Sequence, residues 1–243
     1  MALFETVAVH KTFGGERNLV RALSDLNMRV KSGEFVAIMG PSGSGKTTLL
    51  NILGSLDRVS SGEVLFNGRG FNAMSEGELS ILRRRCFGFV FQSFNLFPFL
   101  TVEENVELPL VLDGRKPKER RQRVAELLEW AGLLDRRRHR PGQLSGGEQQ
   151  RTALCRAVAP DPMVILADEP TGNLDVQSAE VVLDLLSRQS RENGRTVLLV
   201  THSVDAAARA GRVLFLKGGV LKSELSLEGG KGARDVLDAL KEL

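Results

Sequence analysis

Residues 40–47 read GPSGSGKT, a glycine-rich segment that follows the apolar run EFVAIM at 34–39 and precedes the helical run TTLLNILGSL. A strand, a glycine-rich turn and a helix in this order form a loop whose backbone N–H groups can surround phosphate oxygens. The segment also fits the pattern G-x-x-x-x-G-K-[ST], in which the lysine neutralises phosphate charge and the hydroxyl ligates Mg²⁺. We therefore predict a phosphate-binding loop with Lys46 and Thr47 in these two roles. The alternative, a glycine-rich turn with a surface lysine, leaves the flanking strand and helix unexplained.

Short β-rich apolar runs recur along the chain. They lie at 3–9, 34–39, 86–91, 163–167 and 196–200. Three of them (34–39, 163–167 and 196–200) are apolar on both faces, which is typical of buried parallel strands. A helical pattern follows at 175–193, where Asp175 can cap the start and Gly194 the end. Strands that alternate with helices predict an α/β fold in which helices flank a sheet.

The stretch from 93 to 160 has a different pattern. We expect it to open with a loop containing Pro98 and Pro109, to continue as a helix in KPKERRQRVAELLEWAGL, and to hold no strand. These features predict a single domain over 1–243, in which a helical subdomain at 93–160 interrupts a core made of 1–92 and 161–225. Residues 226–243 form a tail whose apolar residues have helical spacing, so we expect a short terminal helix docked on the core.

The composition excludes several other classes of protein. The chain is 42% hydrophobic and 26% charged, which is typical of a globular domain. No apolar stretch is long enough to span a bilayer, and the N-terminus does not resemble a signal peptide. The two cysteines form no CxxC pattern, so we expect neither a disulfide framework nor a zinc site, and a reducing cytosol fits them. The net charge of +3 is too small to argue for DNA binding.

A second chemical signal lies in MVILADEP at 163–170, an apolar strand that ends in two acids. An acid at the end of a strand beside a phosphate-binding loop suits a water-mediated contact with Mg²⁺, and Asp168 is placed for it. Glu169 follows directly and can polarise an attacking water. The same residues could simply end a strand in a capped turn, but the loop at 40–47 favours the functional interpretation.

Between these two motifs, residues 144–150 read LSGGEQQ. This segment resembles the signature of the ATP-binding-cassette (ABC) family, and the resemblance covers the chain from about residue 3 to about residue 222. Ser145 and the glycines after it would lie at a helix N-terminus, which is a favourable place for an anion. The resemblance implies a P-loop NTPase core, with a mixed sheet and a small antiparallel β part. It also implies that the signature completes the γ-phosphate site of a second copy, so that ATP is sandwiched in a head-to-tail dimer.

The resemblance implies a role for each residue of the site. Gln92 matches the glutamine that senses Mg²⁺ and the attacking water, and His202 matches the histidine that contacts the γ-phosphate. Phe13 stands where the family usually has a tyrosine stacked on adenine, and stacking needs only the aromatic face. The residues implied to catalyse hydrolysis are Glu169 and His202. Those implied to bind ATP within one copy are Phe13, Val20, Gly40, Pro41, Ser42, Gly43, Ser44, Gly45, Lys46, Thr47, Thr48, Gln92 and Asp168. Those implied to act across the dimer are Gln143, Ser145, Gly146, Gly147, Glu148 and Asp175, and those implied to hold Mg²⁺ are Thr47, Gln92 and, through water, Asp168.

The kind of cassette protein follows from spacing and from longer segments. The interval from Lys46 to Leu144 is too short for the coiled coils of chromosome-maintenance ATPases. Translation-associated cassette proteins carry two ATPase domains in one chain, whereas this sequence shows the motifs of one. The segments LGSLDRVSSGEVLFNG, FNLFPFLTVEENVELPL and LADEPTGNLD resemble the bacterial group of lipoprotein-release, macrolide-export and cell-division ATPases (the LolD, MacB and FtsE types). The resemblance implies an Mg²⁺-dependent ATPase subunit at the cytoplasmic face of the inner membrane. Its implied partners are a second copy, a transmembrane permease and, through the permease, a periplasmic protein.

Two other functions remain open at this stage. One is a cell-division ATPase that regulates wall hydrolases through its permease, and the other is the ATPase of an uptake system. A cassette protein acting on nucleic acid is disfavoured by the near-neutral charge, so we expect no nucleic-acid partner. An apolar cluster directly follows Gln92 and includes Phe94, Phe97 and Phe99. We expect part of it to bind the permease.

Overall fold

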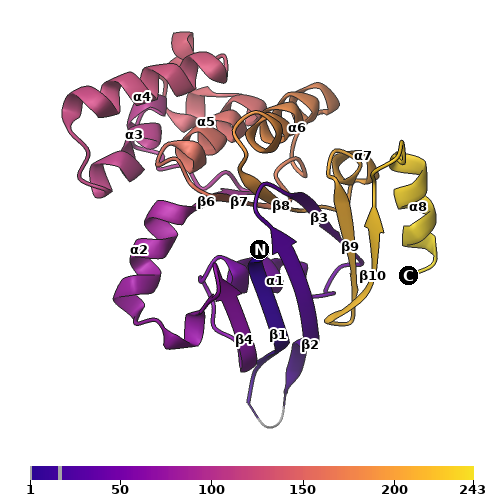
Figure 1. Ribbon diagram of the computed structural model, residues 1–243. Coiled ribbons are helices and arrows are strands. Elements are labelled where there is room, and N and C mark those ends of the chain that lie inside the picture. The colour runs from indigo at the N-terminus through magenta and orange to yellow at the C-terminus, as the bar shows by residue number, and fades with distance from the viewer. Residues whose placement is uncertain (1, 16–17) are drawn as a thin grey trace.

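The computed structural model describes residues 2–15 and 18–243 (Figure 1). Its larger sheet has six strands in the order β10-β9-β3-β8-β7-β6. Their bounds are β3 (Phe35–Met39), β6 (Phe87–Phe91), β7 (Val164–Asp168), β8 (Thr196–Val200), β9 (Arg212–Lys217) and β10 (Val220–Ser226). All neighbouring pairs except β9 and β10 are parallel. The carboxyl ends of β3, β6, β7 and β8 therefore meet at one edge of the sheet, where α/β proteins bind their ligands.

The smaller sheet has four antiparallel strands in the order β2-β1-β4-β5. It consists of β1 (Ala2–Phe13), β2 (Val20–Lys31), β4 (Ser61–Phe66) and β5 (Arg69–Gly70). The predicted small antiparallel part of the fold is thus confirmed. Phe13 pairs with Val20 in the register of β1 and β2, so the two residues implied to hold adenine lie side by side at one end of this hairpin.

The two faces of the larger sheet bury separate cores, because successive residues of a strand point to opposite faces. Val36 and Ile38 of β3 pack with the smaller sheet and with α1 (Lys46–Leu53). Phe35, Ala37 and Met39 pack on the other face, against the helices. The strand runs are therefore apolar throughout, as the sequence predicts for buried parallel strands.

Three α-helices and two short 3₁₀ turns lie between β6 and β7 and form the upper part of the molecule in Figure 1. They are α3 (Val102–Leu112), α4 (Pro117–Trp130), η2 (Leu134–Arg136), η3 (Pro141–Gln143) and α5 (Gly146–Val158). One expectation is wrong here: Pro109 lies inside α3 and not in a loop. The helix forms around it because Thr101 and Glu104 make a complete capping box at its start. The buried residues Val102, Val106 and Leu110 then anchor one face of α3.

Five other helical elements complete the fold. They are η1 (Phe71–Ala73), α2 (Glu76–Cys86), α6 (Val176–Arg191), α7 (Val204–Ala207) and α8 (Ala233–Lys241). Asp175 caps α6, because its carboxylate accepts a hydrogen bond from the Ser178 backbone N–H at 2.9 Å. α8 lies in the expected tail and docks on α7 through the fully buried Val236. In the described part of the chain, no helix combines the length and the apolar character needed to cross a bilayer.

Candidate functional site

The glycine-rich loop connects β3 to α1 and wraps tightly against neighbouring backbone. Gly45 has φ 98°, and a Cβ there would lie 2.3 Å from the Ala22 carbonyl oxygen, so only glycine fits. The Lys46 ammonium folds back into the loop and donates hydrogen bonds to the carbonyls of Gly40 and Pro41, each at 3.0 Å. Lys46 is thus held where the loop N–H groups and the start of α1 converge, which is a strong anion site.

The charges around Lys46 lie in a partly dry environment. Lys46 is 6% exposed, and burial lowers the pKa of its ammonium, while the carboxylates of Glu169 and Asp168 oppose that shift. Burial also raises the pKa of Asp168 and that of Glu169, against the attraction of nearby cations. Two desolvated carboxylates and one desolvated ammonium therefore share a small volume, and such perturbed groups cluster at functional sites.

Asp168 at the end of β7 reaches the start of α1. The Thr47 hydroxyl donates a hydrogen bond to Oδ1 of Asp168 at 3.1 Å. A hydroxyl and a carboxylate are the hard oxygen donors that Mg²⁺ prefers, and Mg²⁺ commonly takes only one or two protein ligands. Within the described residues, no cluster of three or more acidic, histidine or cysteine side chains forms a complete metal cage. The pair Thr47 and Asp168 therefore fits Mg²⁺ that also binds phosphate oxygens and water.

Glu169 lies in an unusual backbone position beside His202. Its φ is +47°, a left-handed conformation that is strained for a side chain other than glycine or asparagine. Its backbone N–H donates to the Val200 carbonyl at 2.9 Å, which ties the turn after β7 to the end of β8. Its Oε1 lies 3.1 Å from Nε2 of His202. The neighbouring strands β7 and β8 thus place a carboxylate and an imidazole together at the same edge of the sheet.

Gln92 follows β6 and contacts the turn that carries Asn173. The Gln92 amide donates to the Asn173 side chain at 3.3 Å, and the Asn173 amide donates to the Gln92 carbonyl at 3.3 Å. Both side chains are exposed. Gln92 follows β6, Asp168 ends β7 and His202 follows β8, so the three residues lie at the ends of three adjacent strands of one sheet.

The signature segment begins α5 with a complete capping box. Ser145 accepts a hydrogen bond from the Glu148 backbone N–H at 3.2 Å, and the Glu148 carboxylate accepts one from the Ser145 N–H at 2.8 Å. Arg136 also binds Glu148 at 2.9 Å, and these contacts lower the pKa of Glu148. A Cβ on Gly147 would lie 2.5 Å from the Ser178 hydroxyl, so this glycine permits α5 to approach α6 closely.

The signature segment and the phosphate loop are separate within one copy. Among the described residues, no hydrogen bond or ion pair joins 143–148 to 40–48. The Gln143 side chain instead accepts a bond from the Arg140 N–H at 2.8 Å, and Asp175 caps α6. The residues implied to act across a dimer are thus not brought to the phosphate loop of their own copy.

Phe13 and Val20 are 44% and 61% exposed, so both present apolar surface that a flat ring could cover. The Lys11 ammonium lies 4.7 Å from the centroid of the Phe13 ring, a cation–π distance. The residues 16–17 between the two strands lie outside the described part of the chain.

Sequence reasoning missed two features near the site. The first is Gln150, which is fully buried and whose amide donates to the carbonyls of Phe91 and Pro170 at 3.2 and 2.6 Å. The second is the tail, because Leu240 and Leu243 help line a 440 Å³ cavity beside the loop. The other residues of this cavity are Gly40, Pro41, His202 and Lys217. A polar residue on the buried face of α5 was a readable signal for Gln150, whereas the position of the tail had none.

Comparisons with known proteins agree with this geometry. The sequence model of the family described as "ABC transporter" matches residues 23–172. An uncharacterized ABC transporter ATP-binding protein of Methanocaldococcus jannaschii, MJ0796, is 47% identical over 225 residues, which cover 91% of this chain and 96% of that protein. The macrolide export ATP-binding/permease protein MacB of Marinobacter nauticus is 47% identical over 226 residues, which cover 93% of this chain and 35% of MacB. The chain thus spans about a third of that relative's length.

Solved structures give the same match. A dimeric structure of MJ0796, described as a post-hydrolysis state bound to ADP and Pi, has a TM-score of 0.87 and 44% identity. The match covers 93% of this chain and 99% of that one. A second dimeric structure of the same cassette has a TM-score of 0.87 and 45% identity.

Proposed function

The chain belongs to the ABC transporter family, and from that premise we propose that two copies bind two ATP molecules between them, hydrolyse the ATP and drive a membrane permease. The observation that carries this proposal is the meeting of Lys46, Asp168, Glu169 and His202 at the carboxyl ends of three neighbouring strands. A buried cation next to a preformed turn of N–H donors suits the phosphates of a nucleotide. A carboxylate next to an imidazole suits the activation of water.

In this proposal the loop 40–48 holds the β- and γ-phosphates. Lys46 exchanges its hydrogen bonds to Gly40 and Pro41 for phosphate oxygens, which are stronger acceptors because they are charged. Phe13 and Val20 cover the adenine ring. Thr47, Gln92 and, through water, Asp168 would hold Mg²⁺, and the bound ion would supply positive charge next to the phosphates.

Glu169 is the general base of the proposed reaction. Its raised pKa follows from burial, and a more basic carboxylate accepts a proton from water more readily. His202 lies against Oε1 of Glu169, so it can orient that carboxylate and also reach the γ-phosphate. The proton of the attacking water moves to Glu169 as the water oxygen bonds to the γ-phosphorus, and ADP leaves.

The second copy supplies the remaining contacts. Ser145 caps α5 and Gly146 and Gly147 begin it, so the N–H groups of the two glycines, the Ser145 hydroxyl and the helix dipole form a second anion site. This site makes no bond to the phosphate loop of its own copy in the described residues, which supports a contact across a dimer. Asp175 lies beside it at the start of α6, and Gln143 lies just before it. Two structures of MJ0796 are described as dimeric, which supports the proposal of a dimer.

The partner permease is proposed to dock in an apolar cavity of about 610 Å³, here called the docking groove. Aromatic side chains form much of it, and Phe97 on its edge is 51% exposed. Arg156 fixes the adjoining loop through hydrogen bonds to the carbonyls of Phe94 and Asn95. The residues that line the groove are Leu56, Ser80, Arg83, Arg84, Phe87, Gly88, Phe89, Phe91, Phe97, Leu108, Pro109, Leu112, Arg156, Ala157 and Pro160.

The group of relatives favours an export, lipoprotein-release or mechanotransmission role over uptake. The MacB relative is named as an ATP-binding and permease protein, and the match covers 93% of this chain but only 35% of MacB. We therefore place this chain as a peripheral subunit at the cytoplasmic face of the membrane that holds its permease.

The experiment that tests the proposal is ATP hydrolysis by the purified chain with Mg²⁺. The parent should release phosphate from ATP, and Glu169→Gln should bind ATP yet release phosphate at a rate at least about a hundredfold lower, as is usual when a general base is removed. Equal hydrolysis by the parent and by Glu169→Gln would show that the base is misassigned.

A further inference from the structure

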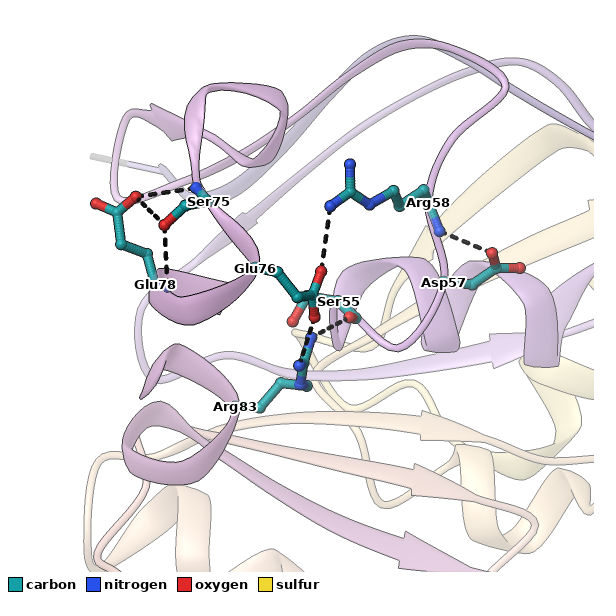
Figure 2. Close-up of polar contacts among 7 residues, drawn as sticks. All are labelled: Ser55, Asp57, Arg58, Ser75, Glu76, Glu78 and Arg83. Atoms are coloured by element: carbon teal, nitrogen blue, oxygen red, sulfur yellow. Dashed lines mark hydrogen bonds and ion pairs between the residues drawn. The ribbon is translucent and has the colours of Figure 1, made fainter. Parts of the chain in front are cut away.

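A further cavity lies on a neighbouring face of α2, between that helix, the end of α1 and the smaller sheet, and Figure 2 shows several residues of its rim. We call it the α1–α2 cavity, and its volume is about 380 Å³. Its walls combine apolar and polar surface: Ile52, Val64 and Leu79 are almost fully buried behind it, and charged side chains lie at its rim. The remaining lining residues are Ser55, Leu56, Asp57, Arg58, Val59, Phe71, Asn72, Glu76 and Arg83. The role proposed above for ATP does not use this cavity, and the docking groove shares only the lining residues Leu56 and Arg83 with it.

The rim of the α1–α2 cavity carries two arginines that share one carboxylate. Figure 2 shows Arg58 and Arg83 reaching Glu76 from opposite sides, with N···O distances of 3.1 and 2.8 Å. Asp57, the other acid of the lining, is held by the Lys11 ammonium at 2.6 Å. The rim therefore has one guanidinium more than it has available carboxylates.

The two arginines differ in how much freedom they have. Arg83 is 24% exposed and is also fixed by a hydrogen bond to the Ser55 carbonyl at 2.8 Å. The Arg58 side chain is 73% exposed, and its only side-chain hydrogen bond among the described residues goes to Glu76. Arg58 can therefore offer its remaining N–H donors to an incoming carboxylate in the bidentate geometry that arginine favours.

Ser55 provides an independent sign that something binds here. The residue is 7% exposed, and its hydroxyl is buried without a hydrogen-bond partner among the described residues. A buried hydroxyl without a partner costs free energy, so such groups are rare unless a ligand or partner satisfies them. Ser55 belongs to the lining of the α1–α2 cavity, so an occupant with a polar group could reach it.

The α1–α2 cavity continues into the docking groove. Leu56 and Arg83 line both cavities, and Leu56 is 48% exposed between them. A partner bound in the docking groove and contacting Leu56 is therefore next to the α1–α2 cavity. This continuity favours a part of the same partner over an unrelated ligand.

We propose that the α1–α2 cavity is a second docking site for the permease and receives a cytoplasmic segment that carries an apolar side chain next to a carboxylate. The apolar side chain fills the interior against Phe71 and Leu79, and the carboxylate binds Arg58 at the rim. Arg83 keeps Glu76 in place and joins this site to the docking groove. The inference rests on the proposed function, because it takes the permease as the partner.

The test uses overlapping 15-residue peptides that cover the cytoplasmic segments of the permease encoded beside this chain. Binding of each labelled peptide to the full-length chain is measured by fluorescence polarisation. A peptide with adjacent apolar and acidic residues should bind the parent, and Arg58→Glu should weaken its binding about tenfold or more, because like charges then face each other. Asn72→Trp, which adds bulk at the exposed rim, should weaken it too.

Arg69→Glu is the matched control. Arg69 is exposed and pairs with Glu78 of the same helix, as Arg58 pairs with Glu76, but it lines neither cavity. The Arg69→Glu variant should bind the peptide as tightly as the parent does. Phe97→Glu should keep peptide binding while losing capture of the whole permease, which separates this site from the docking groove.

Three results would overturn the inference. In the first, only basic or purely apolar peptides bind. In the second, Arg58→Glu and Arg69→Glu bind equally well. In the third, no peptide binds although the whole permease is captured by the parent and lost by Phe97→Glu. In that last case the proposed function stands and the second site does not. A chain that neither hydrolyses ATP nor captures the permease would instead refute the proposed function.

Discussion

Replacing Gln150 with methionine tests how the helical subdomain is fixed to the edge of the sheet that carries the proposed ATP site. The Gln150 amide connects α5 to the carbonyl of Phe91, just before Gln92, and to the carbonyl of Pro170, just after Glu169. Methionine has nearly the same length and shape but no donor, so the substitution removes both bonds without opening a cavity.

The expected loss of stability in Gln150→Met depends on which hydrogen bonds the two carbonyl groups retain. The Pro170 carbonyl is buried and would lose its bond from Gln150, which costs roughly 1–3 kcal/mol. The Phe91 carbonyl keeps a bond from the Phe94 N–H at 3.2 Å, so its loss is about 1 kcal/mol. Oε1 of Gln150 is itself buried without a partner, and its removal returns roughly 1 kcal/mol. The net loss is about 2 kcal/mol.

Urea and thermal unfolding of the nucleotide-free chain measure this loss. A decrease of about 2 kcal/mol should lower Tm by roughly 4–8 °C in a chain of this length. Gln149→Met is the control, because Gln149 is only partly buried and makes one bond, to the Leu144 carbonyl at 3.2 Å. Its loss should be below about 1 kcal/mol. If Gln150→Met and Gln149→Met unfold at the same urea concentration, the buried amide does not hold α5 to the sheet.

Two further predictions concern the charges of the site. Burial raises the pKa of Glu169, so its ionised form destabilises the nucleotide-free fold above that pKa, and the cost disappears as pH falls below the ordinary glutamate value. Glu169→Gln should therefore raise Tm at pH 7–8 and match the parent near pH 4, and a gain that is independent of pH would contradict this cause. Lys46→Ala should weaken ATP binding by a single copy, whereas Ser145→Arg should keep that binding and abolish hydrolysis. Equal loss of ATP binding in both variants, measured by equilibrium dialysis, would argue against a site shared between copies.

The sequence predicts most of the residues at the proposed ATP site, because they follow strands whose patterns are local. Asp168 directly follows an apolar run, His202 follows one after a single residue, and Lys46 follows one after the glycine-rich loop, and parallel strands bring their carboxyl ends together. The order of the strands was not predictable in this way. β8 lies between β3 and β7 although it comes last of the three in the chain, which sets Glu169 against His202.

Other features depend on contacts between distant segments. Pro109 reads as a loop residue, yet it lies inside α3, since the capping box and the buried face outweigh the one hydrogen bond that proline cannot make. At the α1–α2 cavity, Arg58 from the segment after α1 contacts Glu76 of α2, which also pairs with Arg83. No local sequence pattern predicts this contact. The Glu148 carboxylate is likewise occupied by Ser145 and Arg136, which the signature sequence alone does not reveal.

The most direct test of the account is the mass and nucleotide content of Glu169→Gln with saturating ATP and Mg²⁺. Light scattering coupled to size exclusion should give a particle of twice the 26.6 kDa chain mass, and quantification of bound nucleotide should give two ATP per particle. The same variant without nucleotide should elute as a single chain, and adding Ser145→Arg should prevent the dimer. A chain that remains a monomer with ATP bound, or a dimer whose formation does not depend on ATP, would contradict the claim that two copies share the nucleotide between Lys46 of one and Ser145 of the other.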